Sequence, residues 1–179
     1  MSLHADAVRL LSAWAAPGQR QEALRRDYLT HLAAHADGVW RGSRPDHLTA
    51  SALVVDPQRG RVLLGLHAKA GLWLQMGGHC ERGDGSLEAA ALREATEESG
   101  LDDLTLLPGP AHLDRHPAPC SPDARHHLDV QWVAVAPPGA VIRRSPELLD
   151  LRWAPFDALP EPTDAAVRRL VARAQQLVG

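Results

Sequence analysis

The chain has 179 residues, of which 45% are hydrophobic and 23% charged, with a formal net charge of −3. This composition is that of an ordinary folded domain, and it excludes disordered and fibrous proteins. The net charge is small and the sequence has no basic stripe, which argues against long nucleic acid as a partner. No run reaches the roughly 18 apolar residues of a membrane span. Two cysteines give no disulfide framework, and the first residues lack a signal-peptide pattern, so we expect a cytoplasmic protein.

The first forty residues have a helical pattern. Apolar residues recur with helical spacing from Leu3 to Trp14, where the Pro17-Gly18 pair interrupts them. A second helix is predicted for about residues 19–36, ending at Asp37-Gly38. Because an apolar stripe must be buried, we expect these helices to pack on the core domain or on a second subunit.

Strand patterns begin near residue 48. The segments LTASALVVD and RVLLGLH flank the turn-forming PQRG, which is typical of a hairpin. A short apolar stretch and a glycine-rich loop follow, and then a predicted helix at residues 86–99, with Ser86 as N-cap and Gly100 after its last residue. The remaining predicted elements are strands near residues 104–107, 111–116, 126–136 and 149–155, and an amphipathic helix over residues 163–179.

The helix at residues 86–99 carries an unusual group of acids. At about 100° per residue, Glu94, Glu97 and Glu98 fall in one narrow stripe, with Arg93 spaced for an ion pair with Glu97. A solvated helix surface explains that pair, but like charges at these spacings repel one another and destabilise a helix. A divalent cation explains the three neighbouring acids, because Mg²⁺ takes hard oxygen ligands and shares its shell with substrate phosphates.

These residues resemble the Nudix box, whose pattern is G-x5-E-x7-R-E-U-x-E-E-x-G-U, with U an aliphatic residue. Gly78 matches the opening glycine, and REATEESGL, residues 93–101, matches the closing half, apart from the small Ala95 at the aliphatic position. Asp84 stands where the first glutamate belongs. One extra residue, which we assign to Gly85, separates it from Arg93, so this insertion could swing Asp84 out of register.

The resemblance covers roughly residues 48–159 and implies an α/β fold, namely an α/β/α sandwich with a mixed β-sheet. It divides the chain into an N-terminal helical extension, residues 1–46, and a Nudix hydrolase domain, residues 47–179. The implied function is metal-dependent hydrolysis of a diphosphate bond in a nucleoside diphosphate derivative or a similar small metabolite. The implied cofactor is Mg²⁺ or Mn²⁺.

The resemblance also implies roles for residues of the box. Glu97 and Glu98 are expected to bind the metal, with the carbonyl of Gly77 as a further ligand. Glu94 is expected to complete the metal shell or to polarise the attacking water. Arg93 is expected to orient Glu97 or a neighbouring acid, so the predicted catalytic residues are Arg93, Glu94 and Glu97.

Some candidates lie outside the box. Glu147 is a candidate catalytic base. Arg44 and His47, near Arg41, are predicted to contact substrate phosphate, and the alternative is that they belong to a solvated linker.

Another segment contains His116, Cys120, His126 and His127, which as a group could bind zinc. It lacks the regular pairs of structural zinc sites, so we expect a rim of the substrate cleft and no stoichiometric zinc. His79 and Cys80 are expected to shape the metal loop.

Two other functions stay open. A non-hydrolysing ligand sensor with this fold usually loses acids of the box, whereas this chain keeps them. An enzyme similar to isopentenyl diphosphate isomerase needs a catalytic cysteine and a further acid cluster, and Cys80 lacks the usual surrounding motifs. The leaving group is not determined, and a homodimer is an open alternative, because dimers are common in similar proteins.

Overall fold

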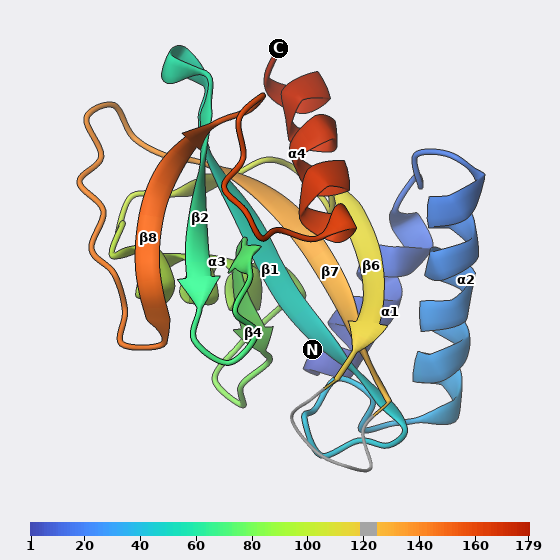
Figure 1. The fold of residues 1–179 in the computed structure, drawn as a ribbon. Helices are drawn as coiled ribbons and strands as arrows, with labels where there is room; N and C mark the ends of the chain where they lie inside the picture. Colours follow the sequence, from blue (N-terminus) through green and yellow to red (C-terminus); the bar gives the residue numbers. More distant parts are fainter. Residues whose placement is uncertain (119–124) are drawn as a thin grey trace.

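A mixed sheet forms the centre of the computed structural model, which describes residues 1–118 and 125–179. In these residues eight strands and four α-helices are present (Figure 1). The strands are β1 (Asp46–Asp56), β2 (Arg61–His67), β3 (Trp73–Leu74), β4 (Met76–His79), β5 (Thr105–Leu106), β6 (His112–Pro117), β7 (His126–Val135) and β8 (Leu148–Pro155). The helices are α1 (Leu3–Ala13), α2 (Gln19–Ala34), α3 (Leu87–Ser99) and α4 (Ala165–Val178).

Strands β1 and β7 are the two central strands, and they run parallel in register from Asp46 opposite His126 to Val55 opposite Val135. The other pairings are antiparallel: β2 and β4 pair with β1, β5 and β6 pair with β7, and β3 and β8 pair with β2. The predicted β1–β2 hairpin is confirmed. Its turn is a short 3₁₀ helix, and Gly60 follows it with a φ of 61°, a conformation that suits glycine.

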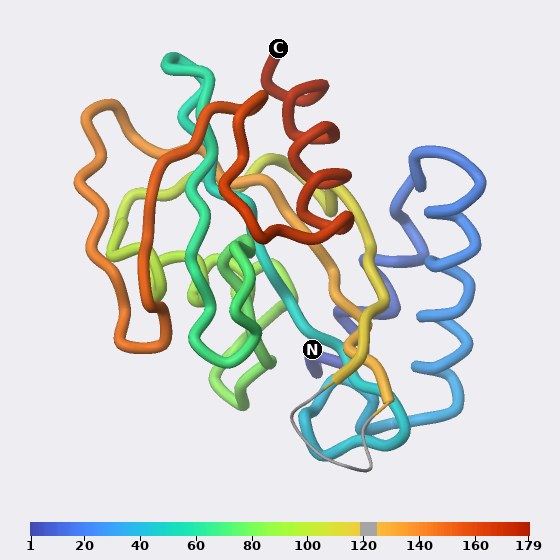
Figure 2. Tube along the Cα trace, viewed as in Figure 1, coloured from blue at the N-terminus to red at the C-terminus, as the bar shows by residue number. Residues whose placement is uncertain are grey.

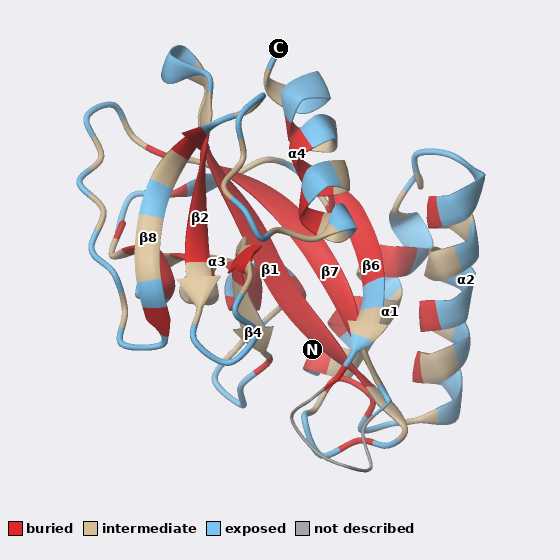
Figure 3. Cartoon of the chain, viewed as in Figure 1, coloured by how far each residue is buried: buried red, intermediate tan, exposed pale blue. Residues whose placement is uncertain are grey.

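The sheet is covered on both faces, and the predicted α/β/α sandwich is confirmed. Along β1, Leu48, Ala50 and Ala52 belong to the apolar cluster that includes α3 and α1. Leu53 and Val55 belong to the cluster beneath α4. Figure 3 shows this pattern, with buried residues along β1 and β7 and exposed residues on the outer faces of the helices. The strand period of two therefore separates two apolar layers.

The N-terminal helices pack on the core domain, which is one of the two expected arrangements. Figure 2 shows α2 running beside β6. The buried side chain of Gln21 bonds both the N–H and the carbonyl of Leu113 on β6, and the buried Tyr28 hydroxyl donates to the carbonyl of Asp114 at 2.6 Å. The extension therefore pairs with an edge strand as well as burying apolar surface.

The boundaries of these segments differ slightly from the expectation. Helix α2 ends at Ala34, two residues before the predicted end, because the backbone of His35 is extended; the N–H of His35 makes the last helical bond, to the carbonyl of His31. Strand β1 begins at Asp46, and the predicted division between residues 46 and 47 stays a prediction. None of the helices described here is both long and apolar enough to cross a membrane.

Candidate active site

Two glycines of β4 let the strand lie unusually close to its neighbours. A Cβ at Gly77 would stand 2.3 Å from the Cβ of Ser51, and a Cβ at Gly78 would stand 2.6 Å from Oε1 of Glu94. Both distances are too short for any larger residue without movement. A side chain at the opening glycine of the box would therefore displace the carboxylate of Glu94, which lies directly against it.

Helix α3 is held so that one stripe faces the sheet and the acids stand at its margin. The hydroxyl of Ser86 caps the helix by accepting from the N–H of Ala89 at 3.0 Å, and Gly100 ends it with a φ of 68°. The small Ala95, which departs from the aliphatic consensus, is fully buried in the same cluster as Leu87. Packing against β1 thus explains why a small residue fits there.

The acids of α3 line a cavity of about 220 Å³. Its lining residues are Glu94, Glu97, Glu98, Ser145, Pro146 and Glu147. The structure therefore brings Glu147, from the loop before β8, to the acids of the box. A larger cavity of about 360 Å³ lies between Trp14, Gly109 and Arg173, and it has no carboxylate in its lining.

Arg93 organises the site. Its guanidinium forms a two-point ion pair with Asp84, at 3.0 and 3.1 Å, and reaches Glu94 Oε1 at 3.0 Å and Glu97 Oε2 at 3.2 Å. It also donates to the carbonyl of His79 at 3.1 Å. The hydrogen bond to Asp84 is the main reason why the pKa of Arg93 is raised. The insertion therefore leaves Asp84 inside the network, where it anchors Arg93.

The acids differ strongly in exposure. Glu98 is 7% exposed, and its Oε2 accepts the N–H of Gly77 at 2.9 Å, yet burial raises its pKa to about 7. Burial also raises the pKa of Glu94, although Arg93 opposes this, whereas the side chain of Glu97 is 59% exposed. The charges of Glu97 and Glu147 raise both pKa values further. This hard-oxygen donor set fits a divalent cation, which would relieve the repulsion among the acids.

Not every predicted residue lies at this cavity. The N–H of Gly77 donates to the carboxylate of Glu98. The role of the Gly77 carbonyl as a metal ligand stays a prediction. Arg44 is exposed and donates to the carbonyls of Arg41 and Ser43. His47 is fully buried in β1, so it does not belong to a solvated linker, and neither it nor Arg44 lines the cavity. Their contact with phosphate stays a prediction.

The group of zinc candidates is divided in the structure. His116 pairs with Asp114, and His126 pairs with Asp46. Cys120 lies outside the described residues. His127 contacts His47 and His79, two residues that the sequence analysis did not connect with it. His47, His79 and His127 come together only because β1, β4 and β7 pair in this register.

Comparison with known proteins identifies the family. Residues 45–174 match the family model described as a NUDIX domain. The chain belongs to the NUDIX family. Among curated proteins, none matches it.

Solved structures of other NUDIX proteins have the same fold. A NUDIX-family hydrolase from Clostridium perfringens is 26% identical, with a TM-score of 0.62 over 74% of this chain and 98% of that one. A MutT NUDIX hydrolase from Burkholderia pseudomallei is 27% identical, with a TM-score of 0.55 over 72% and 97% of the two chains. An Ap4A hydrolase from C. elegans, 19% identical, has a TM-score of 0.63 over 73% and 96%, and shows likeness of fold alone. The predicted class, a NUDIX hydrolase acting on phosphoanhydride bonds, is confirmed.

Proposed function

We propose that this NUDIX protein uses Mg²⁺ or Mn²⁺ to hydrolyse a diphosphate bond in a nucleoside diphosphate derivative or a similar small metabolite. The observation that carries the proposal is the gathering of Glu94, Glu97, Glu98 and Glu147 around one cavity of about 220 Å³. Related folds include an Ap4A hydrolase and a dihydroneopterin triphosphate pyrophosphohydrolase from E. coli. A NUDIX domain of NrtR from Shewanella oneidensis is complexed with ADP ribose. These names support a phosphorylated, nucleotide-like substrate.

Each acid would have a separate task. Glu94, Glu97 and Glu98 would hold the cation, which when bound neutralises charge on the phosphate oxygens and makes water a better nucleophile. Arg93 holds Glu94 and Glu97 in place through its ion pairs. The N–H of Gly77 fixes Glu98. Glu147 lines the same cavity but lies outside the box, and it would accept a proton from the attacking water.

The alternatives are less well supported. Burial raises the pKa of the Cys80 thiol to about 12, which opposes the thiolate chemistry of an isomerase that uses a cysteine. A ligand sensor needs no complete acid set, whereas this cavity is lined by all three acids of the closing half of the box, Glu94, Glu97 and Glu98. The cytoplasmic location stays a prediction, and so does a homodimer.

The test is a screen of diphosphate substrates with Mg²⁺ or Mn²⁺, reading released phosphate or monophosphate. With an accepted substrate, Glu97→Gln and Glu98→Gln should lower turnover by orders of magnitude, because several kcal/mol of transition-state stabilisation are lost and about 1.4 kcal/mol corresponds to tenfold. Lys69→Ala, which removes an exposed side chain that does not line the cavity, should change turnover little. If both glutamine variants keep near wild-type turnover, the metal-site proposal is wrong. Binding of the substrate without turnover would favour a sensor.

A further inference from the structure

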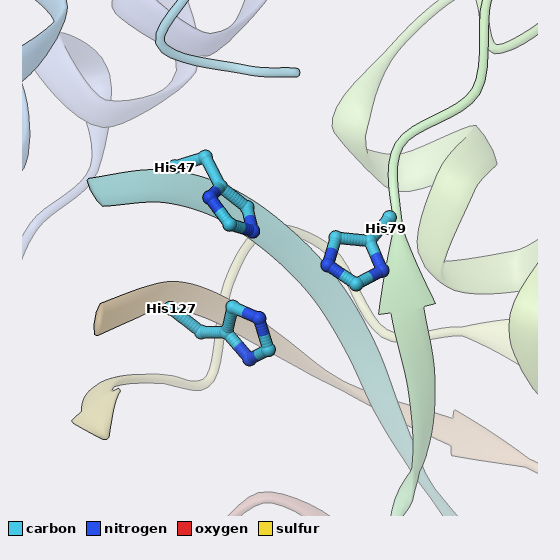
Figure 4. A group of neighbouring side chains, drawn as sticks. All are labelled: His47, His79 and His127. Carbon is cyan, nitrogen blue, oxygen red and sulfur yellow. The ribbon is translucent and has the colours of Figure 1, made fainter. Parts of the chain in front are cut away.

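Three histidines from three strands meet on the face of the sheet opposite α3. His47 of β1 lies opposite His127 of β7 in the parallel register, and His79 of β4 lies opposite Thr49, the next residue of β1 on the same face. Figure 4 shows the three imidazole rings turned toward one another. One ring nitrogen of each can be chosen so that all three lie within 4.8 Å of one another.

The rings are not packed as an ordinary aromatic core. Their centroids lie 5.0 to 5.2 Å apart, so three polar rings face a common centre. Nearby Asp129, buried on the same face, accepts hydrogen bonds from Thr49, Ser51 and Gln131. In contrast, Nε2 of His79 is buried without a hydrogen-bond partner among the residues described. An unsatisfied buried polar atom is costly, which indicates a missing ligand.

A second layer of polar groups supports the cluster. His116 Nε2 lies 3.3 Å from His127 Nδ1, and His116 Nδ1 lies 3.2 Å from Asp114 Oδ2. Arg169 donates to the other oxygen of Asp114 at 3.0 Å. Metal-binding histidines commonly have such an outer partner, which orients the ring and fixes its tautomer. This chain of contacts orients the ring of His127 beside His47 and His79.

Burial lowers the pKa of all three imidazoles. Burial, with the neighbouring histidines, lowers the pKa of His79 to about 4 and that of His127 to about 3. Burial also lowers the pKa of His47. Neutral imidazole is the form of histidine that binds a metal ion through a ring nitrogen.

We propose that His47, His79 and His127 form a binding site for a divalent transition-metal ion, with Zn²⁺ as the best fit, separate from the acidic cavity. Neutral imidazole nitrogens suit Zn²⁺, whereas the carboxylates of α3 suit Mg²⁺ or Mn²⁺. Nitrogens at about 2.0–2.1 Å from a tetrahedral ion lie roughly 3.3 Å apart, so the three rings would move inward slightly on binding. Three ligands leave a fourth position for water or a bound molecule.

The site adjoins the hydrolytic site along β4. His79 directly follows Gly78, and its carbonyl accepts from Arg93 at 3.1 Å. The two sites nevertheless use different side chains and different ligand chemistry, because the cavity of Glu94, Glu97, Glu98 and Glu147 contains no histidine in its lining. A measurement can therefore separate them.

The first test titrates the metal-stripped full chain with Zn²⁺ by calorimetry while excess Mg²⁺ competes at the acids. One Zn²⁺ per chain should bind, and His79→Gln and His127→Gln should each weaken binding by at least about 100-fold, since loss of an outer-layer partner already costs about 10–100-fold. The matched control is His126→Gln. His126 neighbours His127 but pairs with Asp46, so this variant should bind as the wild type does.

Two readouts keep the result independent of variant folding. In the wild type, Zn²⁺ should shift the side-chain ¹⁵N resonances of three histidines, and Co²⁺ should give the visible bands of a tetrahedral site. Thermal melts in EDTA show whether each variant is folded before titration. The proposal is overturned if wild type binds no Zn²⁺ under Mg²⁺, if folded His79→Gln and His127→Gln bind as wild type does, or if only Glu97→Gln and Glu98→Gln abolish binding.

Discussion

At the scale of single residues, Glu98 shows how burial prepares an acid for a cation. Its carboxylate accepts one N–H, from Gly77, yet burial raises its pKa from 4.5 to about 7. A carboxyl group with a raised folded pKa stabilises the protein fully below its unfolded value. That contribution is lost as the pH rises through about 7, because the folded state then holds a buried charge. The metal-free protein should therefore be less stable above neutral pH, because Glu98 is then a buried charge.

A Glu98→Gln variant tests this expectation, because glutamine keeps the size of the side chain without its charge. In EDTA, the free energy of unfolding of the variant should exceed that of the wild type increasingly between pH 5 and 8, by on the order of 2–3 kcal/mol at pH 8. Saturating Mg²⁺ should remove most of this advantage, because the wild type gains a ligand that the variant holds poorly. Urea unfolding at several pH values measures the difference. A difference that does not change with pH contradicts the assigned burial effect.

Gly78 offers a test of geometry at the same site. In Gly78→Ala the new methyl would meet the carboxylate of Glu94, the mobile end of a side chain, so the fold should survive while Glu94 moves. Such a displacement at a catalytic group can lower turnover by about 10²-fold. Gly83→Ala and Gly85→Ala are matched controls from the adjoining loop, since a Cβ there meets no atom within 4 Å. Melting temperatures first show that the three variants are equally folded, and their turnover is then compared. If Gly78→Ala turns over substrate as fast as the two controls, the close contact with Glu94 is contradicted.

At the scale of elements, local signals predicted α3 and the β1–β2 hairpin well. The N-cap at Ser86 and the left-handed Gly100 are local features, and so is the turn that ends at Gly60. The helical projection also placed Glu94, Glu97 and Glu98 together. The position of Asp84 could not be predicted, because it depends on how a loop with one extra residue closes onto Arg93.

The beginning of α3 depends on another element that no local pattern connects with it. Asp6 of α1 is buried, and its Oδ2 accepts the N–H of Leu87 at 3.0 Å, which caps the helix that bears the acids. Asp6→Ala should lower the free energy of unfolding by roughly 0.5–2 kcal/mol, the usual range for a lost cap. The control is Arg9→Ala. It removes only the ion pair of a mostly exposed arginine with Asp6, which is worth about 0–1 kcal/mol.

Chemical denaturation of Asp6→Ala and Arg9→Ala measures the free energy of unfolding of each variant. If Asp6→Ala is no less stable than Arg9→Ala, the contact between α1 and α3 does not contribute as a cap. A specific contribution should also appear as faster amide exchange at Leu87, because that N–H loses its acceptor.

At the scale of the whole molecule, the sequence predicted the fold and the acidic site because both are encoded by segments with strong periodicity or close spacing. The histidine cluster is different. His47, His79 and His127 are separated along the chain, and they meet only because β4 and β7 lie on opposite sides of β1 in one particular register. A shift of one residue would turn a strand's side chains to the other face. Pairing register is a property of the assembled sheet, so the sequence alone did not connect these residues.

The N-terminal extension completes the molecule by protecting an edge strand. Gln21 bonds the N–H and the carbonyl of Leu113, and so replaces a neighbouring strand at that point of β6. Unpaired edges invite association with other chains, and buried backbone groups without partners cost about 1–3 kcal/mol. Gln21→Ala should therefore lower the free energy of unfolding by roughly that amount. Arg26→Ala, which removes an exposed contact of α2 with Glu22, should have a smaller effect.

Deletion of residues 1–40 should have a larger effect than either substitution, because it uncovers the apolar cluster beneath α1 and α2 together with the edge of β6. The shortened chain should melt at a lower temperature and associate as its concentration rises, since exposed apolar surface and free strand groups both favour contact between copies. Melting curves and light scattering over a concentration series measure these effects. Gln21→Ala should show a smaller tendency to associate, because α2 remains to cover the apolar face. If the shortened chain is as stable and as monodisperse as the full chain, the helices are an appendage and do not contribute to the core.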